Sequence, residues 1–254
     1  MENKGGIFNA IMDLGELLLQ SGAEVNRVED TVKRMGLAYG FTRVDVFSIT
    51  SNITASAHLP EGTVLTQTRR VLQYATDMNK IEKINHLSRR ACASPIKEED
   101  LAREVENIQQ TKGYNEWVMF FNYGMVSGAF SVFFGGTVAD GITAFLCGLI
   151  LRLAVRLARK IGLKTIVLNF FASAAVGISA LGFIALGLGE HMDKIIIGNI
   201  MLLIPGILLT TSLRDMINGD LVTGIMGLGD AILRSLAISF GFALVMTWFG
   251  GGIL

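Results

Sequence analysis

The chain has 254 residues, 51% of them hydrophobic, and a mean hydropathy of +0.49, which excludes an intrinsically disordered protein. Its 22 basic and 22 acidic side chains balance, so it lacks the basic field of a nucleic-acid-binding protein, and two cysteines are too few for a disulfide scaffold. The 29 glycines exceed the average share and favour helices that pack closely in a membrane.

The first 116 residues are predicted to form an α+β domain. Apolar residues at helical spacing predict a helix through residues 7–18. The motif Ser21-Gly22-Ala23-Glu24 matches a capping box and predicts a second helix, which ends at Gly40. Pro60-Glu61-Gly62 is predicted as a hairpin loop. β-branched runs predict three strands, at residues 44–49, 53–59 and 63–71. Apolar residues at helical spacing predict two further helices, at residues 78–87 and 94–108.

The remaining residues, 117–254, are predicted to form an α-helical transmembrane domain. A crossing takes about 20 apolar residues. Arg152 and Arg156 interrupt one candidate span, which is included because the chain must return between two clear spans. On this basis we predict five helices, at residues 117–137, 139–158, 165–188, 195–213 and 233–253.

Basic residues near the span ends predict the orientation. The link after the second span holds Arg156, Arg159, Lys160 and Lys164 and no acid, so it is expected on the cytoplasmic side. The N-terminal domain then lies in the cytoplasm and the C-terminus outside. No secretory signal opens the chain, because Asp13 and Glu16 interrupt its first apolar stretch. The predicted location is the bacterial cytoplasmic (inner) membrane.

The fourth predicted span contains a proline in the middle of a charge-free run. Pro205 lacks an N–H and is expected to kink or break the helix, and interrupted helices form the binding sites of many transporters. A packing kink is the alternative reading. The predicted substrate pathway at this span and its exit comprises Pro205, Gly206, Thr210, Thr211, Arg214, Asp215 and Asp220.

Arg152 is a second candidate, for an anionic group of the substrate. It lies beyond the membrane midplane toward the cytoplasm, so it can instead extend to the interface. Asn169 and Asn199 are also assigned to the pathway, although bonds between helices explain them equally well.

Enzyme motifs are missing from the sequence. His58, His86 and His191 are scattered, and no GxSxG, HExxH, Walker or Rossmann pattern occurs. We therefore predict no catalytic residues, no metal and no cofactor. Capping and first-turn carboxylates explain the charged group from Glu24 to Asp30.

Two stretches resemble the threonine/serine exporter family. Residues 21–29 together with 44–47 resemble its cytoplasmic domain. Its membrane motif is similar to Pro205-Gly206, Ser212, Arg214-Asp215, Gly219-Asp220 and Gly224. The resemblance implies secondary export of small hydrophilic metabolites, with threonine and serine as the substrates of founding members. Full-length members carry a second, shorter membrane domain, whereas this chain stops after five predicted spans. It is therefore similar to the larger subunit of split members, one of which is linked to succinate export.

Together these observations predict a component of a secondary exporter. Its expected partners are a small hydrophilic metabolite, a small membrane subunit that supplies the missing domain, and the lipid bilayer, with self-association left open and no nucleic acid. One alternative is a membrane-anchored ligand-sensing or scaffold protein. An intramembrane hydrolase is a third class, but a recognisable nucleophile and base are missing.

Overall fold

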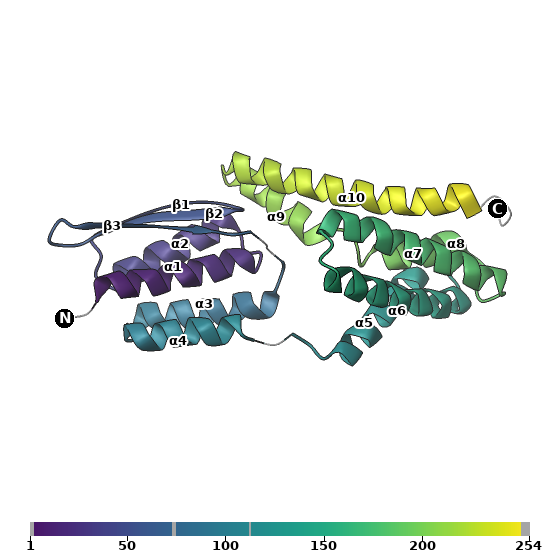
Figure 1. Cartoon of the computed structure of the whole chain (residues 1–254), viewed down its shortest axis with the longest axis horizontal. Coiled ribbons are helices and arrows are strands. Elements are labelled where there is room, and N and C mark those ends of the chain that lie inside the picture. Colours follow the sequence, from purple (N-terminus) through teal and green to yellow (C-terminus); the bar gives the residue numbers. More distant parts are fainter. Residues whose placement is uncertain (1–2, 73–74, 112, 250–254) are drawn as a thin grey trace. The chain divides into compact units, whose positions relative to one another are not determined.

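The computed structural model describes residues 3–72, 75–111 and 113–249 (Figure 1). These residues form two compact units. The first consists of the residues up to 112 together with Ile207–Leu228, and the second of Gly113–Gly206 with the residues from 229 onward. The predicted assignment of residues 1–116 to the cytoplasm and 117–254 to the membrane stays a prediction.

The first unit contains a three-stranded sheet and helices on its apolar side. Its strands pair antiparallel in the order β1-β2-β3, and alternate residues of β2, such as Ile53 and Ala55, are buried. Helix α1 contributes the largest part of the core because most of its side chains are buried. The elements are α1 (Lys4–Gln20), α2 (Val25–Ala38), β1 (Arg43–Ile49), β2 (Asn52–His58), β3 (Val64–Arg70), α3 (Met78–Ala93) and α4 (Glu98–Gln109).

The predicted hairpin loop is confirmed, but the predicted capping box is wrong. Gly62 adopts a φ of +91° in the β2–β3 hairpin, where the N–H of Leu59 donates to the carbonyl of Thr63. Ser21 instead follows the end of α1, and its hydroxyl donates to the carbonyl oxygen of Leu17 at 2.7 Å. Glu24 precedes α2 without a side-chain cap bond, so its carboxylate is available for other contacts.

From residue 113 to residue 249 the described chain is mostly helical. Its elements are α5 (Glu116–Phe133), α6 (Val138–Lys160), α7 (Thr165–Ala185), α8 (Met192–Ile200), α9 (Gly206–Ile217) and α10 (Leu221–Phe249). Within the described residues, α6, α7 and α10 are long and apolar enough to cross a membrane. They correspond to the second, third and fifth predicted spans, while α5 covers the first. Five crossings therefore stay a prediction.

The predicted helix break at Pro205 is confirmed. Helix α8 ends at Ile200 and α9 begins at Gly206, so residues 201–205 form a turn that belongs to neither helix. A proline at this position cannot donate to the carbonyl of Met201, which is the physical reason for the break. Helix α10 begins at residue 221, earlier than the predicted 233, because Gly219 with a φ of +100° and Asp220 end one helix and start the next.

Candidate functional site

In the first unit, the end of α9 lies against the loop that precedes α2. The guanidinium of Arg214 pairs with the carboxylate of Glu24 at 2.5 Å. Asp215 is 6% exposed, and its Oδ1 atom is buried without a hydrogen-bond partner in the described part of the chain. Burial, and then the nearby carboxylates of Glu24 and Asp220, raise the pKa of Asp215 to about 6 against the opposing effect of Arg214. An excess of negative charge therefore surrounds one buried carboxyl group.

Asp215 lines a small cavity within the same unit. The cavity has a volume of about 40 Å³, which is room for a water molecule but not for threonine or succinate. The hydroxyl of Thr211 donates to the carbonyl of Ile207 at 3.0 Å, so that only its lone pairs remain for a ligand. Polar and small residues line much of the cavity, namely Gly22, Thr50, Thr211, Ser212, Asp215 and Thr223.

In the second unit, Arg152 on α6 is buried and paired. Both carboxylate oxygens of Glu116 lie 3.0 Å from its Nη2 atom. The ring of Tyr123 lies beneath the guanidinium, 5.4 Å from ring centroid to Cζ. Sequence reasoning missed Glu116, because this residue lies just before the predicted first span and 36 positions from Arg152. Arg152 is therefore held inside the helical unit.

Asn199 joins three helices of the second unit. Its side-chain oxygen accepts from the hydroxyl of Ser127 on α5 at 3.0 Å. Its amide nitrogen donates to the carbonyls of Ala144 on α6 and Ile195 on α8. Asn199 is fully buried, so these contacts correspond to the alternative reading of a bond between helices. Asn169 is buried in α7.

Asp140 is a buried polar centre that sequence reasoning also missed. It closes a capping box with Thr137 at the start of α6. Its carboxylate also accepts from the backbone N–H groups of Glu190 and His191, at 2.7 and 2.9 Å, and lies 2.9 Å from Nδ1 of His191. The Thr-x-x-Asp spacing is a sequence signal for the capping box, but no local signal points to the loop before α8.

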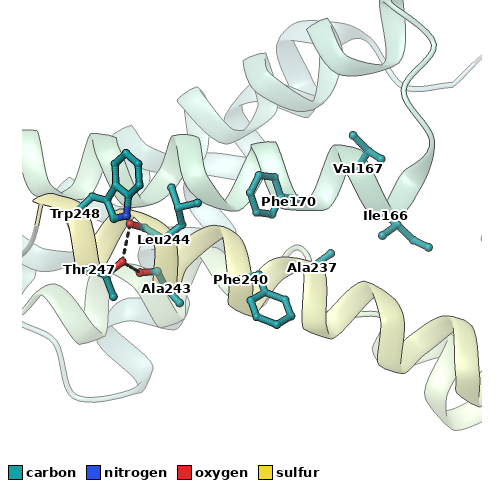
Figure 2. Close-up of a pocket in the computed structure, with 9 residues that line it drawn as sticks. All are labelled: Ile166, Val167, Phe170, Ala237, Phe240, Ala243, Leu244, Thr247 and Trp248. Atoms are coloured by element: carbon teal, nitrogen blue, oxygen red, sulfur yellow. Dashed lines mark hydrogen bonds between the residues drawn. The ribbon is translucent and has the colours of Figure 1, made fainter.

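A groove between α7 and α10 is an apolar hollow of the second unit (Figure 2). Its volume is about 580 Å³, and its lining is almost entirely hydrocarbon and aromatic side chains, among them Phe170, Phe240 and Trp248. A hydrophilic metabolite would lose its hydrogen bonds to water in such a groove without replacement. The groove is therefore a poor candidate for the substrate site.

The structure divides the predicted pathway residues between the two units. Thr211 and Asp215 line one cavity, with Asp220 close enough to affect the carboxyl group of Asp215. Pro205 and Gly206 lie at the helix break, and Thr210 is exposed. Pro205 and Gly206 belong to the second unit, as do Arg152, Asn169 and Asn199. Whether any of them contacts a substrate stays a prediction.

Apolar helices of membrane-spanning length, one broken helix and buried charged side chains are typical of a membrane transport protein. The model of the threonine/serine exporter family, ThrE, matches residues 9–249, and the chain belongs to this family. Its members are transporters and not enzymes, and they export small metabolites.

Individual relatives have different names. The "Probable succinate transporter subunit YjjP" of Klebsiella aerogenes is 25% identical over 92% of this chain and 90% of its own length. The protein of the same name from Escherichia coli K12 is 25% identical, over 98% and 97%. The "Threonine/serine exporter" of Corynebacterium glutamicum is 25% identical over 94% of this chain but only 50% of its own length. No solved structure matches the chain significantly.

Proposed function

We propose that this chain is the larger subunit of a secondary exporter of small hydrophilic metabolites, either amino acids of the threonine/serine type or small dicarboxylates such as succinate. The observation that carries the proposal is the broken helix at Pro205, which is followed by Arg214 and Asp215. Backbone groups freed at membrane depth are tolerated only where protein or a water-filled cavity satisfies them. A break of this kind therefore favours a transport pathway over a simple anchor.

A partner subunit is part of the proposal. The chain spans about half of the Corynebacterium glutamicum exporter but nearly all of the two YjjP proteins, whose name includes the word "subunit". The word "subunit" supports a small membrane protein as the partner of this chain. The complex would lie in the bacterial inner membrane, with five spans from this chain, its N-terminal domain in the cytoplasm and its C-terminus outside.

The proposed pathway residues have separate roles. Pro205 and Gly206 open the fourth span, and Thr210 and Thr211 offer hydroxyls one turn further along. Arg214, Asp215 and Asp220 form the cytoplasmic mouth, where the pair of Arg214 with Glu24 connects the pathway to the N-terminal domain. Asn169, Asn199 and Arg152 belong to the same proposed pathway.

Reconstitution into vesicles tests this proposal. Vesicles that contain the full-length chain, with or without a co-encoded small membrane protein, are loaded with labelled threonine, serine or succinate, and efflux of the label is measured. We expect efflux only when both proteins are present, because the two YjjP proteins that match this chain along most of their length are named as subunits. Efflux by this chain alone would contradict the two-subunit part of the proposal.

Two variants test the mouth. Arg214→Ala and Asp215→Asn are each expected to lower efflux by roughly tenfold, the usual effect of removing a charge-assisted contact. Asp100→Asn is the matched control, because Asp100 forms an exposed ion pair with Arg103 on α4. Unchanged efflux in both mouth variants would show the site assignment to be wrong. Ligand binding by the N-terminal domain without any flux would instead support a sensory or scaffold protein.

A further inference from the structure

Arg152 and Glu116 form an ion pair whose two ends differ sharply in exposure. The side chain of Arg152 is 8% exposed, whereas that of Glu116 is 48% exposed. Glu116 is the first residue of α5, directly after the cap residue Asn115. The carboxylate therefore reaches a buried guanidinium from the surface, and it can return to solvent by rotating about its own side-chain bonds.

The pair also leaves part of the guanidinium unused. Both oxygens of Glu116 contact the single nitrogen Nη2, while Nε of Arg152 is buried and has no hydrogen-bond partner in the described part of the chain. The favoured arrangement of arginine with a carboxylate uses two nitrogens in parallel. Glu116 is therefore an incomplete partner.

The two side chains pay very different costs on separation. The half-exposed carboxylate of Glu116 is hydrated again when it leaves Arg152, so separation of the pair has a small free-energy cost for Glu116. A buried guanidinium without a counter-charge is strongly unfavourable. Exchange of Glu116 for another carboxylate is therefore far easier than its simple departure. Tyr123 keeps its ring beneath Arg152 and can hold the guanidinium in place during such an exchange.

We propose that Arg152 binds the carboxylate group of the exported metabolite, and that Glu116 occupies this position as a tethered competitor between transport events. The inference rests on the proposed function. Threonine, serine and succinate, the compounds in the names of the relatives, all carry at least one carboxylate. A free carboxylate is not restrained by the backbone of α5, so it can use Nε and Nη2 together.

Equilibrium binding of labelled succinate and threonine to the purified full-length chain with its partner protein tests the inference. Glu116→Gln removes the competing charge and is expected to tighten binding roughly tenfold. Arg152→Lys is expected to weaken binding, because an ammonium group cannot reproduce the two-nitrogen contact. Asp230→Asn is the matched control, since Asp230 forms an ion pair with Arg234 in the same unit, and its affinity should equal that of the native protein.

A double variant that removes both charges distinguishes loss of binding from misfolding. The double variant Glu116→Gln with Arg152→Gln has no unpaired buried charge, so it should fold and yet bind neither compound. The diamide succinamide, which lacks a carboxylate, should not respond to Glu116→Gln. Unchanged succinate affinity in Glu116→Gln, or retained binding in the double variant, would overturn the inference and leave Glu116 as a structural partner only.

The two proposals fail separately. Carboxylate binding that responds to Glu116→Gln without efflux from vesicles would support the site and contradict the exporter assignment. Efflux whose concentration dependence is unaffected by Glu116→Gln and by Arg152→Lys would do the reverse.

Discussion

Asp215 combines burial with a concentration of like charge. Its Oδ1 atom has no hydrogen-bond partner in the described residues, and the carboxylates of Glu24 and Asp220 are close enough to oppose its ionisation. These effects raise its pKa from 3.8 to about 6 in the folded protein. A carboxyl group with a raised pKa destabilises the folded state once it ionises, so this cost is absent at low pH and grows as the pH passes from about 4 to above 6.

Asp215→Asn is therefore expected to flatten part of the pH dependence of stability. The amide cannot ionise, so the variant should gain in melting temperature relative to the native protein as the pH rises from about 4 to about 7. Thermal unfolding of both proteins in the same detergent, at a series of pH values, measures the difference. Parallel melting curves across this range would contradict the proposed environment of Asp215.

At the scale of elements, close approach between helices depends on glycine. A Cβ atom added at Gly198 on α8 would collide with the carbonyl oxygen of Ser127 on α5, and one added at Gly148 on α6 would lie 2.6 Å from the carbonyl oxygen of Tyr123. The hydrogen bond between Ser127 and Asn199 lies at the same crossing. Small residues therefore bring these helices near enough for their buried polar groups to meet.

Gly198→Ala is expected to destabilise the second unit by about 1–3 kcal/mol, because the carbonyl of Ser127 belongs to the backbone and cannot turn aside. Gly182→Ala on α7 is the control, since nothing lies within 4 Å of a Cβ at that position. The control should keep or raise the melting temperature, as alanine favours helix over glycine. Equal melting temperatures for the two variants would show that α5 and α8 do not pack this closely.

At the scale of the whole molecule, the chain passes between its two units at residues 112/113, 206/207 and 228/229. Helix α9 and the first part of α10 therefore belong with the N-terminal domain, to which Arg214 is paired through Glu24. This grouping gives the proposed exporter a direct physical link between its N-terminal domain and the segment that follows the helix break.

Cysteine labelling in intact cells tests the proposed orientation. In a background with Cys92→Ser and Cys147→Ala, Glu190→Cys in the loop before α8 should react with a membrane-impermeant maleimide. Glu61→Cys in the β2–β3 hairpin should react only after permeabilisation. Four basic residues at the end of α6 and in the link to α7 favour the cytoplasmic side, and this orientation places the N-terminal domain in the cytoplasm. Labelling of Glu61→Cys in intact cells would show that the N-terminal domain lies outside and would contradict the proposed orientation.

The sequence was most informative where the responsible signal is local. The strands and their hairpin follow from β-branched runs and turn residues, and the helix break follows from Pro205. The prediction of a capping box was wrong although Ser21 and Glu24 have the right spacing. The backbone at Ser21 and Gly22 ends α1 instead, with Gly22 at a φ of +84°. Many sequences satisfy such a short motif, and only the surrounding chain decides whether it caps a helix.

Local patterns in the sequence were sufficient to predict the α+β fold of the first residues, the apolar helices that follow, the interrupted helix and the family. All of these depend on periodicity, hydropathy or motifs within a few tens of residues. Three contacts became visible in the folded chain alone. Arg152 pairs with Glu116, Arg214 pairs with Glu24 across 190 positions, and Asp140 accepts a hydrogen bond from the backbone N–H of His191. A charged side chain pairs with the polar group that helix packing brings within about 3 Å of it. Local sequence patterns do not specify that distance, so they do not predict the partner.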